Sequence, residues 1–224
     1  MKKKIVLISL FILPVVIYLF FASGIYHFGE LPVLTEKVGD LEAFSTEDGQ
    51  KVKLDEKITV LGFLGNDFST KKSSVYNLHE EIYKGNYDYD TNFQMVMVLP
   101  KDTESQVADL KLELSRYAKI DKWRFVYGDD FEIKELFQSL QTPFSLNSDL
   151  GSDYVFIIDK KSSLRGRLPD EENDKIYGYN ANLVSELHNL MDDDVKVVLA
   201  EYNLALKKNY KVSRRDSFLK QKKK

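Results

Sequence analysis

Four short, largely apolar runs, separated by segments with helical spacing, constrain the fold of this 224-residue chain more than any other feature. The runs are 58–64, 93–99, 123–127 and 154–158. Runs of this length are typical of strands buried on both faces of a sheet. The intervening segments, in which apolar residues recur at helical spacing, are 69–84, 103–117 and 129–140. This alternation predicts an α/β sandwich with parallel strand pairs.

The two segments that follow the fourth run complete the expected topology. Residues 163–168 follow the fourth run closely and are expected to pair with it as a further strand. A long last helix is expected over 180–208, where apolar residues line one face. A sheet that ends on two adjacent strands and a helix is typical of the thioredoxin fold.

Local signals mark turns and helix ends. Glu47-Asp48-Gly49 lies between two short runs, 41–44 and 50–54, and predicts a hairpin ahead of the first buried strand. Capping residues are expected at the start of three helices: Ser69 or Thr70, Thr103 with Gln106 as a capping box, and Asp129 or Asp130.

The charge of the chain is strongly asymmetric. The net charge is −3, yet the segment 207–224 holds nine Lys or Arg and a single acid, Asp216. Without this segment and the lysines at 2–4, the remainder carries about −14. A body this acidic repels nucleic acid, so no DNA or RNA partner is expected. One domain is expected over 30–208, followed by a charged, disordered tail over 209–224.

The N-terminal segment has the pattern of a membrane anchor. The basic residues 1–4 precede the apolar segment 5–23, which is just long enough to span a bilayer once as a helix. The lysines before it orient the body to the periplasmic, extracytoplasmic side of the cytoplasmic membrane. A cleaved signal peptide, with Ala22-Ser23-Gly24 as a weak cleavage site, is the alternative, and a buried helix of a soluble protein is a third. The chain has no cysteine to lipidate, which excludes a lipoprotein.

The absence of cysteine limits the possible chemistry. It excludes disulfides, thiolate catalysis and Cys-ligated zinc or iron–sulfur sites. The absence matters most at residues 63–71, which look like the strand-to-helix turn where thioredoxin-like proteins carry reactive cysteines. A thiolate is both a nucleophile and a soft metal ligand, whereas Asn66 and Thr70 can be neither.

Three stretches resemble the Sco/SenC family of thioredoxin-like copper-handling proteins. Residues 63–70 have the spacing of the family's Phe-x-x-Cys-x-x-x-Cys turn. Residues 123–129 are similar to its tryptophan-containing strand and Gly turn, and 154–166 to its strand–Asp–turn–Gly hairpin. The resemblance covers roughly residues 40 to 190 and implies a thioredoxin-like three-layer sandwich. A peroxiredoxin-like relative is the other option within the superfamily.

The positions that carry the family's ligands are all replaced. Asn66 and Thr70 occupy the two cysteine positions, and the place of the copper-ligating His falls near Gly151, with no His from 150 to 153. The family's copper binding and thiol–disulfide activity are therefore not expected, and no catalytic, cofactor-binding or metal residue is assigned. No proline immediately precedes Tyr154, where redox-active thioredoxins place a cis-proline.

The turn is nevertheless a possible interaction surface. Its members are Gly65, Asn66, Asp67, Phe68 and Ser69. Free backbone N–H groups and the helix dipole at a helix N-terminus favour an anion or a polar group of a partner. The simpler interpretation, which these residue types favour, is that Asn66, Asp67 and Ser69 cap the helix.

Other candidate sites have simpler structural explanations. Met95 and Met97 share one strand face and, with His79, could supply substitute Cu(I) ligands, although packing in the core is the preferred interpretation of the two methionines. Arg165 and Arg167 alternate on a strand and are expected to form structural ion pairs.

Together these observations favour a non-catalytic, membrane-anchored module that binds an unidentified protein during assembly or support of a respiratory oxidase or another envelope complex. Two alternatives remain: a copper chaperone that uses Met95, Met97 or His79, and a thiol-independent enzyme with a carboxylate- or Asn-based mechanism on an unknown substrate.

Overall fold

The computed structural model describes residues 12–15, 30–66, 68–87, 92–116, 118–169 and 174–204. The basic segment 1–4, nearly all of the expected anchor 5–23 and the tail 209–224 lie outside these ranges. Within the described ranges, no helix combines the length and the apolar character needed to cross a bilayer.

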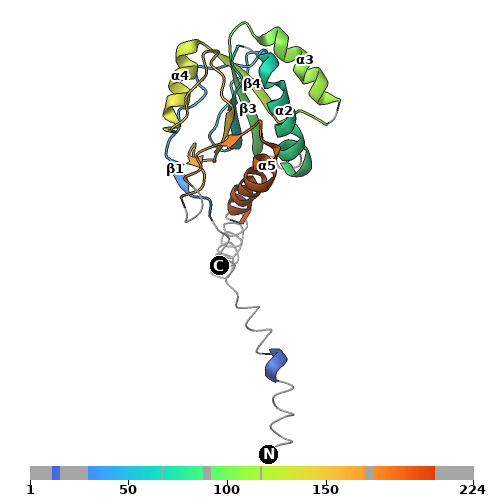
Figure 1. Cartoon of the computed structure of the whole chain (residues 1–224), viewed down its shortest axis with the longest axis vertical. Helices are drawn as coiled ribbons and strands as arrows, with labels where there is room; N and C mark the ends of the chain where they lie inside the picture. The colour runs from blue at the N-terminus through green and yellow to red at the C-terminus, as the bar shows by residue number, and fades with distance from the viewer. Residues whose placement is uncertain are drawn as a thin grey trace, which may run out of the picture.

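A seven-stranded mixed sheet forms the centre of the molecule (Figure 1). Its strand order is β1-β6-β5-β2-β3-β4, and β7 pairs with β5. The strands are β1 (Val33–Thr35), β2 (Ile58–Phe63), β3 (Phe93–Pro100), β4 (Trp123–Gly128), β5 (Tyr154–Ile158), β6 (Leu164–Arg165) and β7 (Tyr179–Asn180). β2, β3 and β4 are parallel, whereas β5 runs antiparallel to both β2 and β6. The four predicted buried strands are confirmed. Within the predicted segment 163–168, Leu164 and Arg165 pair with the fourth strand, whereas Arg167 forms a bridge with Ile176.

Helices cover both faces of this sheet. The 3-10 turn η1 (Phe68–Lys71) leads into α2 (Lys72–Leu78), which continues as the π-helix η2 (His79–Tyr87). The other helices are α3 (Glu104–Ser115), α4 (Asp130–Ser139) and α5 (Val184–Glu186), the last of which continues through η3 (Leu187–Met191) to Leu204. In Figure 1, α4 lies on one side of the sheet, and α2, α3 and α5 lie on the other.

The two faces carry separate apolar cores because successive strand side chains point to opposite sides. Val60 and Met95 pack with Leu78 and Leu110 on the side of α2, α3 and α5. The next residues, Leu61 and Val96, pack with Ile133 and Phe137 of α4 on the other side. The predicted three-layer sandwich is therefore confirmed, and both cores are closed by residues between 31 and 199.

Several local expectations need correction. The turn at Thr46–Gln50 forms, but 41–44 and 50–54 are not paired strands; instead, Ser45 bridges Tyr127 at the edge of β4. The capping box at Thr103 is absent, because its hydroxyl donates to the carbonyl oxygen of Pro100 at 2.7 Å.

Of the remaining predicted helix starts, two differ from the structure and one is confirmed. The N-cap of α2 is Lys71 rather than Ser69 or Thr70. The predicted cap at Asp129 is confirmed as part of a capping box: its side chain accepts from the backbone N–H of Glu132, and Glu132 Oε2 accepts from the backbone N–H of Asp129 at 2.8 Å. The last helix begins at Val184 rather than at 180, because Tyr179 and Asn180 pair with β5 as β7.

Candidate functional site

The turn after β2 is fastened to the loop that precedes β5. Leu64 forms an isolated antiparallel bridge with Gly151. The backbone N–H of Ser152 donates to the carbonyl oxygen of Phe63 at 2.9 Å, and that of Asn66 donates to the carbonyl oxygen of Asp149 at 2.8 Å. Two segments that are about 85 residues apart in sequence therefore form one rigid edge at the carboxyl end of β2.

Gly65 is required by this close approach. Its φ is +73°, in the left-handed region that residues with a Cβ seldom adopt. A Cβ at this position would lie 2.6 Å from the carbonyl oxygen of Asp149 and 2.7 Å from the backbone nitrogen of Gly151. Atoms of Asp149 and Gly151 leave no room for a side chain, so the turn keeps its shape only with glycine.

The structure brings together the positions that the sequence singled out. The bridge sets Gly151 beside Leu64, two residues before Asn66, which is exposed. Ser69 and Thr70 are exposed in η1. Phe68 begins η1, and Asp67 lies outside the described residues.

A buried ion pair, which the sequence did not indicate, lies directly behind the turn. Lys71 follows Thr70, is 5% exposed, and pairs through its ammonium group with the carboxylate of Asp153. The hydrogen bond from Lys71 holds the pKa of Asp153 below its usual value, against the opposing effect of burial. A buried ammonium requires a partner of this kind, because burial without one is expensive.

The ion pair belongs to a wider polar network. The Ser74 hydroxyl donates to Asn182 Oδ1 at 2.5 Å, and the Asn182 side chain also hydrogen-bonds Asp153. Asn77 Nδ2 donates to the carbonyl oxygen of Ala181 at 3.0 Å. These bonds join α2 to the start of β5 and to the connection between β7 and α5. No spacing rule links residues 71, 153 and 182, so only the folded chain reveals this network.

The surface around this network is polar and partly apolar. Asn66, Ser69 and Thr70 are exposed, and the side chain of Asp153 is 44% exposed. Leu183 and Val184, at the start of α5, are 50% and 46% exposed. Such a mixture of polar groups and apolar side chains is suited to contact with another protein.

The substitute copper ligands lie inside the core. His79, Met95 and Met97 are all fully buried in the layer beneath α2. Met97 packs against Gly62, where its sulfur would lie 2.8 Å from an added Cβ. Among the described residues, no group of three His, Cys, Asp or Glu could hold a metal ion.

His79 is unusual because neither ring nitrogen has a hydrogen-bond partner. Its ring stacks on Tyr83, with 5.4 Å between centroids, and lies 6.0 Å from Trp123. Burial lowers the pKa of His79, because the charged imidazolium is disfavoured away from water.

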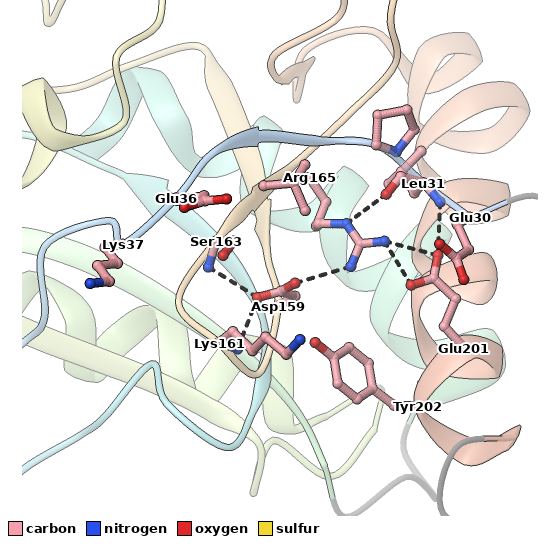
Figure 2. Close-up of a pocket in the computed structure, with 12 residues that line it drawn as sticks. Glu30, Leu31, Glu36, Lys37, Asp159, Lys161, Ser163, Arg165, Glu201 and Tyr202 are labelled. Carbon is pink, nitrogen blue, oxygen red and sulfur yellow. Dashed lines mark hydrogen bonds and ion pairs between the residues drawn. The ribbon is translucent and has the colours of Figure 1, made fainter. Parts of the chain in front are cut away.

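A second polar site lies at the other end of the sheet. A cavity of about 760 Å³ lies here, and Arg165 is one of the residues that line it. Figure 2 shows Arg165 between Leu31, Asp159 and Glu201. Arg165 Nη1 donates to Asp159 at 3.0 Å, Nη2 donates to Glu201 at 2.6 and 2.9 Å, and Nε donates to the carbonyl oxygen of Leu31 at 2.7 Å. Burial disfavours the charged guanidinium, but the bonds to Glu201 and Asp159 outweigh it and raise the pKa of Arg165.

The expectation of structural ion pairing for the two arginines is confirmed. Arg165 is neutralised by Asp159 and Glu201, and Arg167 binds Asp194 at 2.8 and 2.9 Å. Tyr202 lies beside Asp159 in Figure 2, and burial together with that carboxylate raises its pKa to about 12.

The two sites lie at opposite ends of the sheet. Ile158, next to Asp159, pairs with Thr59 at the start of β2, whereas the turn with Asn66 follows the end of β2. Six residues of strand separate these ends by about 20 Å.

Comparison with known proteins identifies the fold. No protein-family model and no curated protein matches the sequence. Among solved structures, BsSco, a member of the Sco family of cytochrome c oxidase assembly proteins with a disulfide switch, is 13% identical and covers 75% of this chain and 97% of its own, with a TM-score of 0.51. A candidate electron transfer protein from Aquifex aeolicus VF5 is 16% identical and covers 74% of this chain and 94% of its own, with a TM-score of 0.52.

Identities this low establish the fold alone. The resemblance that the sequence suggested is confirmed at that level: the chain has the thioredoxin-like fold of a Sco protein, and it has that fold without a cysteine.

Proposed function

We propose that this chain is a non-catalytic protein-interaction module, anchored in the cytoplasmic membrane by residues 5–23, with its domain on the extracytoplasmic side. Its role is assembly or support of a respiratory oxidase or another envelope complex. It binds a protein partner and does not transfer copper or electrons.

The Lys71–Asp153 ion pair carries this proposal. It lies directly behind the turn where Asn66 and Thr70 stand at the positions of the family's two cysteines, and it joins the helix to the loop that contains Gly151. A redox or copper site needs thiolates or other soft ligands that converge here. The Lys71–Asp153 ion pair holds the same two segments together without redox chemistry and without a metal ion. The fold is therefore stable without such a site and presents this surface to a partner.

The proposed binding surface consists of Asn66, Ser69, Thr70, Asp153, Leu183 and Val184. The exposed apolar pair at the start of α5 would supply buried contact area, and the polar groups of the turn would fix the orientation of the partner. The oxidase is the first partner to test because BsSco belongs to a family of cytochrome c oxidase assembly proteins.

A complementation experiment tests this proposal. Cells that lack the protein are assayed for membrane oxidase activity after they receive the wild-type chain or the variant with Asn66→Arg and Ser69→Arg. The wild-type chain should restore activity, and the variant should not, although it accumulates to the same level. The matched control is Lys134→Glu on the exposed side of α4, which should restore activity fully. Full restoration by the turn variant would contradict the assigned binding surface.

The copper-chaperone alternative has one observation in its favour. His79, Met95 and Met97 share one layer of the core, and both ring nitrogens of His79 are without partners. All three side chains are sealed from solvent, however, so metal entry would require the core beneath α2 to open. The interaction module needs no such opening, and we therefore favour it.

A further inference from the structure

One edge of the sheet, at β4, is only partly covered. β4 ends the strand order and pairs with β3 on one side. The backbone N–H of Met95 in β3 donates to the carbonyl oxygen of Lys122 at 2.9 Å, and Met95 is in register with Trp123. In a parallel pair, this pattern directs Lys122 and every second residue after it toward β3. The backbone N–H and C=O groups of Trp123, Phe125 and Tyr127 therefore point outward.

Phe125 is the outward residue whose backbone groups are unpaired. Tyr127 exchanges two backbone hydrogen bonds with Ser45, at 2.9 and 3.2 Å. The backbone N–H of Trp123 donates to the carbonyl oxygen three residues before it, and its own carbonyl oxygen accepts from Arg124 Nη1 at 3.1 Å. The backbone N–H and C=O of Phe125 have no partner among the residues that the structure describes. Phe125 is 3% exposed, so an unfilled edge leaves two polar groups largely shielded from water, which is unfavourable.

A cavity of about 610 Å³ lies beside this unpaired position. Its lining consists of residues 46–48 and 50, Lys111 of α3 and residues 123–125 of β4. Ser45 is antiparallel to Tyr127, so an extended chain would bring the second residue after Ser45 opposite Phe125. The chain turns away instead, because the backbone N–H of Thr46 donates to the carbonyl oxygen of Gln50 at 3.1 Å. The place of a neighbouring strand is therefore left open at Phe125.

The charges that line the cavity indicate which ligand would fit. Glu47 is paired with Lys111 at 3.0 Å, and Asp48 accepts hydrogen bonds from two other residues of the turn. Arg124 donates only to main-chain carbonyl oxygens, and no carboxylate in the described part of the chain forms an ion pair with it. A guanidinium binds a carboxylate more strongly than it binds neutral carbonyl groups. The cavity therefore favours a ligand with an acidic side chain near Arg124.

We propose that this edge binds an extended peptide of a partner protein, which pairs with Phe125 as Ser45 pairs with Tyr127 and directs an acidic side chain to Arg124. The peptide residue opposite Phe125 exchanges both backbone hydrogen bonds with it. The next peptide residue lies opposite Arg124 and on the same face, because side chains alternate along paired strands. Added strands bind through main-chain bonds and gain specificity from their side chains. This inference does not rest on the binding surface around Asn66.

Peptide binding to the full chain in detergent tests the inference by fluorescence polarisation. The probe is a library of labelled threonine heptapeptides in which the central residue and the residue after it are varied. We expect an acid after the central residue to bind about fivefold more tightly than Lys, the factor for one partly exposed ion pair. Arg124→Glu should reverse this preference, and the control Lys134→Glu on α4 should not. N-methylation of the central residue should weaken binding about tenfold, because it removes a hydrogen bond. N-methylation of the next residue, whose N–H points away from β4, is the matched control.

Hydrogen exchange of the Phe125 amide, followed by NMR, locates the bound peptide. Exchange that becomes slower when the peptide binds would support pairing at this edge. Slow exchange without peptide would mean that the edge is already covered, by the chain itself or, if sedimentation equilibrium shows a dimer, by a second copy, and either result overturns the inference. So would the absence of saturable binding by any library member at about 1 mM, or binding that is insensitive to both Arg124→Glu and central N-methylation. Sensitivity to N-methylation alone would contradict the acidic side chain assigned to the ligand.

Discussion

Lys71 and Asp153 form an ion pair whose two members are unequally buried: the side chain of Lys71 is 7% exposed, and that of Asp153 is 44% exposed. The inequality has a consequence for stability. Removing the carboxylate leaves an ammonium in the interior without its anion, whereas removing the ammonium leaves a carboxylate that water can reach.

We therefore expect Asp153→Asn to destabilise the domain more than Lys71→Met. The expected losses in the free energy of unfolding are about 2–3 kcal/mol and about 1 kcal/mol, the first reduced from the value for a fully buried pair because Asp153 is partly solvated. Urea unfolding of both variants measures the difference. Equal losses would mean that the pair behaves as an ordinary surface salt bridge.

Gly65 and Gly49 provide a matched test of the turn geometry, because both have φ of +73°. A Cβ on Gly49 meets nothing within 4 Å, whereas a Cβ on Gly65 meets backbone atoms of Asp149 and Gly151. We expect Gly49→Ala to cost about 1 kcal/mol from backbone strain alone. Gly65→Ala should cost about 2–4 kcal/mol, because the clash adds to the same strain. Similar costs in urea unfolding would show that the turn and the loop are not packed as described.

The turn after β2 and the Lys71–Asp153 ion pair illustrate which features can be predicted from the sequence. The strands β2 and β3 were predictable because residues 58–64 and 93–99 are long enough and apolar enough to be buried on both faces. The turn at Asn66 was predictable because it follows such a strand and precedes a helical pattern. The partner of Lys71 was not, because Asp153 is 82 residues away and ion pairs between distant elements leave no periodic signal.

The local errors have a common cause. Thr103 and Gln106 have the spacing of a capping box, and 41–54 has the pattern of a hairpin, but tertiary contacts offered better partners. The Thr103 hydroxyl bonds Pro100 at the end of β3, and Ser45 bonds Tyr127 at the exposed edge of β4. Short-range propensity is a weak predictor where a neighbouring strand can supply the hydrogen bonds.

A metal titration distinguishes the interaction module from the copper-chaperone alternative. We expect the full chain in detergent to bind no Cu(I) in competition with a colorimetric chelator under anaerobic conditions, because the substitute ligands proposed, Met95, Met97 and His79, are all buried. Stoichiometric binding that is lost in Met95→Leu and Met97→Leu would reverse this conclusion. Binding that those changes leave intact would place the ligands outside the described core.

Acid should destabilise the domain through His79. Burial lowers the pKa of this imidazole in the folded state, so the unfolded chain binds a proton more readily. The unfolded state therefore gains stability as pH falls below about 6.5, the ordinary pKa of histidine, until the pH passes the lower pKa of the folded state.

We expect His79→Phe to remove this loss of stability between pH 7 and pH 5, because the ring still packs on Tyr83 and Trp123 but takes up no proton. Urea midpoints measured across this range test the prediction. The control His188→Gln, at an exposed position paired with Glu81, should retain the acid sensitivity of the wild-type chain. If His79→Phe lost stability at low pH as the wild-type chain does, other titratable groups would be responsible for the loss.

Arg165 with its partners Leu31, Asp159 and Glu201, which we call the basal clamp, should be the costliest ion-pair site in the domain to break. Arg165→Leu leaves Asp159, whose side chain is 2% exposed, and Glu201, at 16%, without their cation. Removing one partner of a buried pair typically costs about 3–5 kcal/mol, because the remaining charge is stranded away from water. Lys84→Gln, which breaks an exposed pair with Glu80 one helical turn away, should cost only about 0.5 kcal/mol. If urea unfolding gave similar small losses for both, the clamp would not hold the two ends of the domain together.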